Sequence, residues 1–115
     1  TAQEMTTTVD EPIHRSIVHL NQHLTEPLQL QDLAEMAGYS LSYYKQKFKQ
    51  EVGITPSEYM MLQKIERAKK ILTESDQSIT NIAFSMGFSS SNYFCSVFKK
   101  FMDCTPKDYR KKYRE

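Results

Sequence analysis

The sequence predicts an all-α fold of seven helices, in which a long linker helix joins two helix-turn-helix subdomains. The first observation is an internal repeat: residues 30–59 recur as residues 79–109, at an offset of 49 that becomes 50 after one extra residue in the second loop. Each copy has apolar residues every three or four positions on both sides of one glycine, Gly38 or Gly87. The chain also lacks the two-residue alternation that predicts strands. Each copy therefore has the pattern of a helix, a turn and a second helix.

The start of the chain differs from the repeated part in composition. The segment TAQEMTTTVDEP is polar, and it has neither the basic flank nor the apolar stretch of a signal peptide. No run of about 18 apolar residues is present, so no membrane span is expected. The 115 residues suffice for one helical domain. Because the chain does not begin with Met, we expect it to be a piece of a longer protein.

Local signals set the expected helix boundaries. Pro27 interrupts the first apolar pattern, and Gly38 ends the second helix because glycine tolerates a positive φ. Thr55, Pro56 and Glu58 have the spacing of a capping box at the start of a long helix. The expected helices are residues 13–24, 30–37, 41–52, 56–74, 79–86, 91–102 and a last one from Pro106 to 113. The expected divisions are residues 1–12 as a flexible linker or tail, 13–55 as the first helix-turn-helix unit, 56–75 as the linker helix and 76–115 as the second unit, with residues 13–113 forming one domain.

The second helix of each unit is the candidate for reading DNA, because that helix of a helix-turn-helix enters the major groove. Tyr44 and Phe48 are assigned to the core of the first unit, and Phe94, Val97 and Phe98 to the core of the second. The side chains then expected to face outward are Ser42, Tyr43, Lys45, Gln46 and Lys49 on the first helix, and Ser91, Asn92, Cys95, Ser96 and Lys99 on the second.

The chemistry of these residues divides them into two groups. Lys45 can donate to guanine, and Gln46 and Asn92 can pair bidentately with adenine. Lys49 and Lys99 lie about two turns into their helices, where a phosphate is the expected target. The predicted base contacts are Ser42, Lys45, Gln46, Ser91, Asn92, Cys95 and Ser96, and the predicted phosphate contacts are Tyr43, Lys49, Tyr93 and Lys99. For Tyr43 and Tyr93, a half-buried ring and a phosphate donor are equally good interpretations.

The distribution of charge along the chain supports DNA binding better than the net charge does. The whole chain carries only +1, which is weak for a protein that binds nucleic acid. Residues 1–44, however, have one basic and six acidic side chains, whereas residues 45–115 have 14 basic and eight acidic ones. Local charge is what meets phosphate, so the asymmetry favours a DNA-facing surface after residue 44.

Three segments of the chain are the most characteristic: LAEMAGYSLSYYKQKFKQEVGITPSEY, ERAKKIL and IAFSMGFSSSNYFCSVFKKFMDCTPKDYR. Through them the chain resembles, over about residues 13–113, the DNA-binding domain of the AraC/XylS family of bacterial transcription regulators. The resemblance implies seven helices and places the family's base-contacting positions on the residues named above. It also implies an activator that contacts RNA polymerase, and a separate sensor or dimerisation domain, usually N-terminal.

The chain departs from the family pattern at three positions. Gln46 and Ser96 stand where many members have Arg, which puts the family's target sequences in doubt here. Lys47 stands where the family often has an apolar residue. Its stem is expected to cover the core while its amine reaches water.

Catalytic and metal-binding functions have little support in the sequence. We find no nucleophile–base arrangement and no phosphate loop, so no catalytic residue and no cofactor are expected. Cys95 and Cys104 are expected to be free thiols, although a disulfide is an alternative. Oxidation of Cys95 as a redox signal is a further alternative. His19 and His23 are four residues apart but lack a third ligand, so no metal site is expected.

We therefore expect a cytoplasmic, sequence-specific DNA-binding domain of a bacterial transcription activator. The expected partners are double-stranded DNA and RNA polymerase. We expect no membrane contact and no small-molecule effector site within this chain, and dimerisation would use a domain outside it. The rival interpretation is a helical protein-interaction module that has lost DNA binding, which the near-neutral charge permits.

Overall fold

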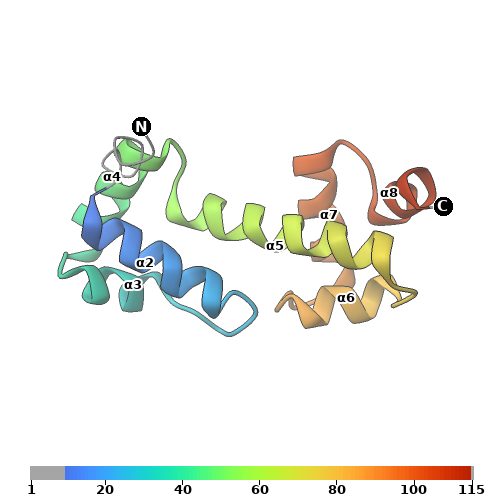
Figure 1. Ribbon diagram of the computed structural model, residues 1–115, viewed down its shortest axis with the longest axis horizontal. Coiled ribbons are helices and arrows are strands. Elements are labelled where there is room, and N and C mark those ends of the chain that lie inside the picture. The colour runs from blue at the N-terminus through green and yellow to red at the C-terminus, as the bar shows by residue number, and fades with distance from the viewer. Residues whose placement is uncertain (1–9, 115) are drawn as a thin grey trace. The chain divides into compact units, whose positions relative to one another are not determined.

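The computed structural model describes residues 10–114, which form seven α-helices and no strand (Figure 1). The helices are α2 (Glu11–Gln22), α3 (Leu30–Ala37), α4 (Leu41–Val52), α5 (Pro56–Glu74), α6 (Ile79–Ser85), α7 (Ser91–Met102) and α8 (Pro106–Tyr113). The predicted all-α fold of seven helices is confirmed.

Five helices have the predicted boundaries, α6 ends at Ser85, one residue before its predicted end, and α2 differs at both ends. It begins at Glu11 and ends at Gln22, two residues earlier at each end than the apolar pattern indicates. Pro12 lies in its first turn, where the missing N–H of proline costs nothing, so Glu11 and Pro12 belong to the helix and not to the predicted tail. The remaining residues of that tail, 1–9, lie outside the described residues.

Side-chain caps fix most helix starts, and one of them is the capping box that the sequence predicts. Thr55 Oγ1 accepts from the Glu58 N–H at 3.1 Å, and the Glu58 carboxylate accepts from the Thr55 N–H at 3.1 Å, which is the predicted capping box. The other side-chain caps are Ser40, Ser78, Ser90 and Thr105, each accepting from the backbone N–H three residues later. Two of these serines precede α4 and α7, and they set which residues come first on those helices.

The chain divides between Met60 and Met61 into two units, each with its own hydrophobic core. In the first unit the core is Ile13, Leu20, Leu24, Leu33, Ala34, Ala37, Tyr44 and Phe48. In the second it is Ile65, Ala68, Leu72, Ile82, Ala83, Met86, Phe88, Phe94 and Phe98. Helix α5 begins in the first unit and continues into the second.

One buried polar contact distinguishes the first core from the second. The Ser16 hydroxyl donates to the Ile13 carbonyl at 2.7 Å, so the hydroxyl of Tyr44 is the donor in its 2.8 Å contact with Ser16. All three side chains are fully buried. The equivalent of Tyr44 in the second unit is Phe94, which needs no such partner.

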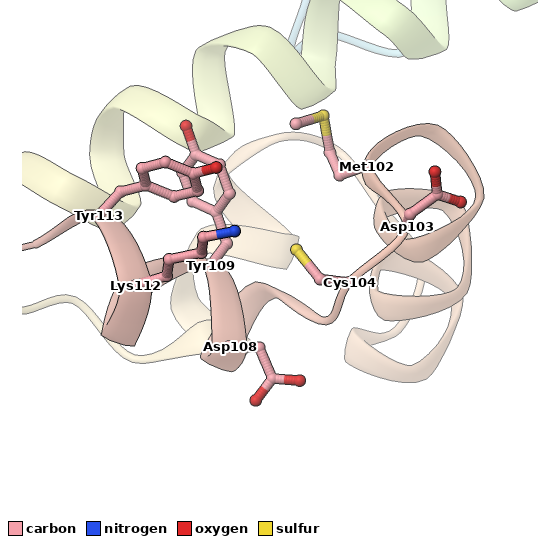
Figure 2. A pocket seen from close by; sticks show the side chains of 7 residues that line it. All are labelled: Met102, Asp103, Cys104, Asp108, Tyr109, Lys112 and Tyr113. Carbon is pink, nitrogen blue, oxygen red and sulfur yellow. The ribbon is translucent and has the colours of Figure 1, made fainter.

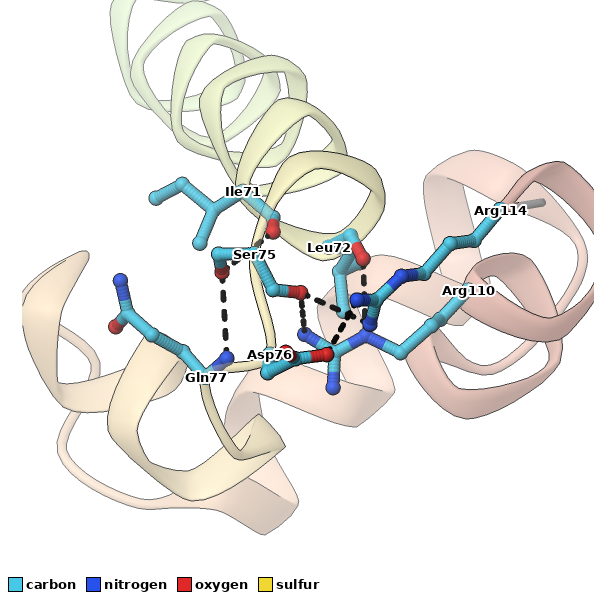
Figure 3. A network of polar contacts seen from close by, with 7 residues as sticks. All are labelled: Ile71, Leu72, Ser75, Asp76, Gln77, Arg110 and Arg114. Carbon is cyan, nitrogen blue, oxygen red and sulfur yellow. Dashed lines mark hydrogen bonds and ion pairs between the residues drawn. The ribbon is translucent and has the colours of Figure 1, made fainter.

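In the second unit, two arginines of the α8 region bind the C-terminal end of α5 (Figure 3). Arg110 donates from Nε to the Leu72 carbonyl at 2.9 Å and from Nη2 to the Ser75 carbonyl at 3.2 Å. Arg114 donates to the same Ser75 carbonyl at 3.2 Å and forms an ion pair with Asp76. The Leu72 carbonyl lies in the last turn of α5 and the Ser75 carbonyl follows it, where carbonyls have no intrahelical donor.

Helices α4 and α7 are both followed by a residue whose backbone is in the left-handed conformation, and the residue type differs between the two units. Gly53 has φ of 99°, and Asp103, its equivalent, has φ of 61°. A Cβ at Gly53 would meet nothing within 4 Å, so the cost of a side chain there is conformational only. We predict that Gly53→Ala lowers the free energy of unfolding by about 1 kcal/mol. Gly53→Asp should cost less than half as much, since Asp tolerates this conformation better.

Urea denaturation of the two Gly53 variants beside the unchanged chain measures both effects. A Gly53→Ala variant as stable as the unchanged chain would contradict the prediction. So would a Gly53→Asp variant that is less stable than Gly53→Ala.

Candidate nucleic-acid interface

Helices α4 and α7 present most of the predicted contact residues to solvent. On α4, Ser42, Tyr43, Lys45, Gln46 and Lys49 are all exposed. On α7, Asn92, Tyr93, Ser96 and Lys99 are exposed, whereas Ser91 and Cys95 are half-buried. The opposite sides of the two helices carry fully buried aromatic side chains, which fix the orientation of the exposed faces.

The exposed face of α4 is hollowed into an open depression of about 630 Å³. Four of the predicted contact residues line it together: Ser42, Lys45, Gln46 and Lys49. Leu41 and Thr55 complete its walls. The four contact residues together supply one hydroxyl, one amide and two ammonium groups, which can donate hydrogen bonds to base edges and phosphates.

Tyr43 and Tyr93 occupy equivalent positions, and each packs against the aromatic residue that follows the turn glycine. The Tyr39 and Tyr43 ring centroids are 4.8 Å apart with the rings nearly perpendicular, and those of Phe88 and Tyr93 are 5.6 Å apart in a similar geometry. Tyr43 is nevertheless 47% exposed and Tyr93 46% exposed. Each tyrosine ring is therefore partly packed and partly exposed, and its role as a phosphate donor stays a prediction.

Cys95 lies closer to the core than the sequence indicates. The prediction that it faces outward is wrong in part, because its side chain packs against the second core. Burial raises the pKa of the Cys95 thiol. A raised pKa disfavours the reactive thiolate, which argues against the alternative of redox sensing.

A polar cluster beside the first helix-turn-helix was not predicted from the sequence. The Tyr39 hydroxyl donates to the Asp10 carboxylate at 2.6 Å, and the Asp10 N–H donates to the carboxylate of Glu51. Lys47 Nζ lies 3.2 Å from the same Glu51 carboxylate. The i,i+4 spacing of Lys47 and Glu51 is visible in the sequence, but Asp10 was assigned to the tail, which hid the rest of the cluster.

Two pKa values reflect this cluster. The hydrogen bond to Asp10, together with burial, raises the pKa of Tyr39 to about 12. The hydrogen bond to Glu51 raises the pKa of Lys47. The Lys47 side chain remains 27% exposed, and its amine is paired with Glu51, a partner that was not assigned to it from the sequence.

Lys64 on α5 is a charged residue that the fold buries. Only 8% of it is exposed, and its ammonium lies 5.3 Å from the centroid of the Phe88 ring. Burial lowers the pKa of Lys64. The face of the Phe88 ring attracts the Lys64 ammonium, which is largely shielded from water.

Cysteines and histidines form no metal site within residues 10–114, where no group of three or more metal-binding side chains occurs. His23 Nδ1 lies 2.8 Å from the Glu26 carboxylate.

Cys95 and Cys104 are free thiols, as expected. Cys104 lies away from the contact residues, in a hollow of about 260 Å³ at the ends of α7 and α8 that Tyr109 and Tyr113 also line (Figure 2).

Comparison with known families identifies the two helix-turn-helix units. The chain matches the helix-turn-helix domain family of the AraC type over residues 33–112, which spans both units. The chain belongs to the AraC/XylS family of transcription regulators. Proteins of this family bind DNA to regulate transcription and are not enzymes.

Individual AraC/XylS relatives agree with this assignment. An uncharacterized helix-turn-helix transcriptional regulator of Staphylococcus aureus is 37% identical over 101 residues, which cover 88% of this chain and 14% of the relative. The transcriptional activator RhaS of Klebsiella pneumoniae is 31% identical over 107 residues, covering 93% of this chain and 38% of the relative. The chain thus spans well under half the length of either relative.

A solved AraC-type structure has the same fold. The DNA-binding domain of AdpA, a global transcriptional factor crystallised with a target DNA, superposes with a TM-score of 0.83 at 25% identity. The match covers 89% of this chain and 92% of that one. Within the described part of this AraC/XylS domain, no helix is both long and apolar enough to cross a membrane.

Proposed function

We propose that this domain binds double-stranded DNA sequence-specifically by placing α4 and α7 in adjacent segments of the major groove. The observation that carries the proposal is that two repeated units each expose a helix with polar and basic side chains while burying its aromatic side. In a helix-turn-helix this is the helix that enters the groove. The proposed base contacts are Ser42, Lys45, Gln46, Ser91, Asn92, Cys95 and Ser96, and the proposed phosphate contacts are Tyr43, Lys49, Tyr93 and Lys99.

The two helices are unequal in this proposal. Lys45 and Gln46 are long, exposed and adjacent to each other in one depression, so they can reach base edges. On α7 the corresponding side chains are shorter, and the Cys95 side chain is partly buried against the second core. We therefore expect α4 to contribute more base discrimination than α7, and Asn92 to be the main discriminating residue of α7.

The wider role is proposed from the relatives and from the resemblance described above. We propose that the domain belongs to a longer bacterial protein that works in the cytoplasm as an activator and contacts RNA polymerase. RhaS, which shares this domain, is named an activator. Effector binding and dimerisation are assigned to a region outside this chain, because the relatives are much longer than the matched part.

Salt-dependent binding tests this function against the protein-interaction module. Fluorescence anisotropy of a labelled duplex, measured at several salt concentrations, should show log K falling linearly with log salt. The slope counts the phosphates that the domain neutralises. An interaction module without DNA affinity would leave the anisotropy unchanged at every salt concentration.

Lys99→Ala should weaken binding to all duplexes by a similar factor. Lys99 is exposed on α7 about two turns from its start, where phosphate is the expected target. Removing one phosphate contact should lower the salt slope by about one. Lys111→Ala, which removes an exposed lysine of α8, is the matched control for the loss of one positive charge. Equal slopes for the two variants would show that Lys99 acts only through net charge.

A further inference from the structure

We propose that Tyr39 and Phe88 are positioning residues that hold the phosphate-contacting tyrosines Tyr43 and Tyr93, and that Asp10 and Lys64 in turn fix these two rings. The inference rests on the proposed function and adds residues that contact no DNA themselves. It explains two features of the structure that the proposed DNA contacts do not account for. They are the polar cluster around Asp10 and the buried ammonium of Lys64.

The geometry of the aromatic pairs carries the first step. In both units, the ring that follows the turn glycine meets the tyrosine edge to face, with interplanar angles of 79° for Tyr39–Tyr43 and 67° for Phe88–Tyr93. Edge-to-face pairs at such distances are favourable beyond simple burial. An exposed tyrosine without this contact would have to lose its rotational freedom on binding a phosphate, and the contact removes part of that cost.

The first unit fixes its positioning ring by a hydrogen bond. Asp10 is the N-cap residue of α2, yet its side chain does not cap that helix and accepts from Tyr39 instead. The Asp10 backbone N–H is tied to Glu51 near the end of α4. Tyr39 is thus anchored through Asp10 to the same helix that carries Tyr43.

The second unit fixes its positioning ring differently, because Phe88 has no hydroxyl. Phe88 is almost fully buried, contacts Phe94 at 5.2 Å between ring centroids, and has the Lys64 ammonium near its ring. A cation within about 6 Å of an aromatic centroid is attracted to the ring. A carboxylate acceptor in one unit and an ammonium in the other thus hold equivalent rings.

Removal of the Tyr39 hydroxyl tests the first unit. Tyr39→Phe keeps the ring that Phe88 provides in the other unit but loses the bond to Asp10. We expect it to weaken binding to a 30-base-pair duplex of high affinity by roughly two- to tenfold, the range of one hydrogen bond. Asp10→Ala should weaken binding equally, and Asp10→Asn, which keeps an acceptor oxygen, should restore most of the affinity.

A double-mutant cycle separates positioning from a general loss of structure. In a Tyr43→Phe background, which lacks the phosphate donor, Tyr39→Phe should cost less than about twofold, because the two changes remove the same contact. An equal loss in both backgrounds would overturn the inference. Retention of full affinity by Tyr39→Phe would also overturn it.

Lys64→Met supplies a second test in the other unit. The change keeps the apolar stem and removes a buried charge, so the domain should be at least as stable in urea as before. DNA affinity should nevertheless fall several-fold, with an unchanged salt slope, because a residue only 8% exposed makes no phosphate contact of its own. A salt slope lowered by one would show that Lys64 binds phosphate directly and would overturn the inference. Unchanged affinity would overturn it as well.

These results stay distinct from a failure of the proposed function. If the domain does not bind DNA through α4 and α7, Lys99→Ala and Lys45→Ala leave binding unchanged. If only the positioning inference is wrong, those two variants lose affinity as expected while the Tyr39 and Lys64 variants do not.

Discussion

Replacing Arg110 by alanine should lower the free energy of unfolding of the second unit by about 3 kcal/mol. The guanidinium of Arg110 donates to the carbonyls of Leu72 and Ser75 at 2.9 and 3.2 Å. Hydrogen bonds from a charged donor contribute about 1.5–3 kcal/mol each, and these two are partly buried, so the lower part of the combined range applies. The loss also leaves the C-terminal carbonyls of α5 with fewer donors.

Two further variants control the Arg110 measurement. Arg114→Ala removes one bond to Ser75 and an ion pair with the exposed Asp76, so it should cost about 1.5 kcal/mol, roughly half of the Arg110 effect. Arg110→Lys keeps the charge but not the planar fork, and it should recover only part of the stability. Chemical denaturation followed by circular dichroism gives all three values. If Arg110→Ala were no less stable than Arg114→Ala, the Arg110 contacts would not be what secures the end of α5.

Lys45→Ala and Gln46→Ala should each cost about 1–3 kcal/mol in binding at a single base position, or about 5- to 150-fold. Both side chains are exposed in the depression on α4, where a long donor or amide can reach a base edge. Stability in urea should not change, because neither residue belongs to the first core. The loss should be confined to duplexes that carry the preferred base.

Competition binding with a panel of singly substituted duplexes measures this selectivity. Lys99→Ala provides the comparison, because a lost phosphate contact weakens all duplexes alike. If Lys45→Ala left the order of preference among the duplexes unchanged, α4 would not be the helix that reads the first segment of the site.

Local sequence signals predicted most of the helix boundaries. The capping box of Thr55 and Glu58 and the left-handed Gly38 depend only on residues close in the chain, so their spacing is sufficient to place them. Internal repetition strengthened these predictions, because each boundary was visible twice. The start of α2 was missed because Asp10 and Pro12 were interpreted as part of a polar tail, although a proline in the first turn is favourable.

The contacts that were missed join residues far apart in the sequence. Arg110 meets Leu72 across 38 positions and Tyr39 meets Asp10 across 29, and no local pattern predicts either pairing. The burial of Lys64 is also not visible from the sequence, because lysine is almost never fully buried unless it is paired. Its partner, the face of the Phe88 ring, becomes visible only when the two segments are folded together.

Selection of bound duplexes from a random DNA library, sequenced after several rounds at moderate salt, tests the central claim most directly. Two helices that read adjacent groove segments on one side of the DNA should enrich a bipartite motif, with blocks about ten base pairs apart. Enrichment should be stronger in the block read by α4. A single enriched block would contradict the claim that both helices read sequence, and no enrichment at any salt concentration would contradict sequence-specific binding by this domain.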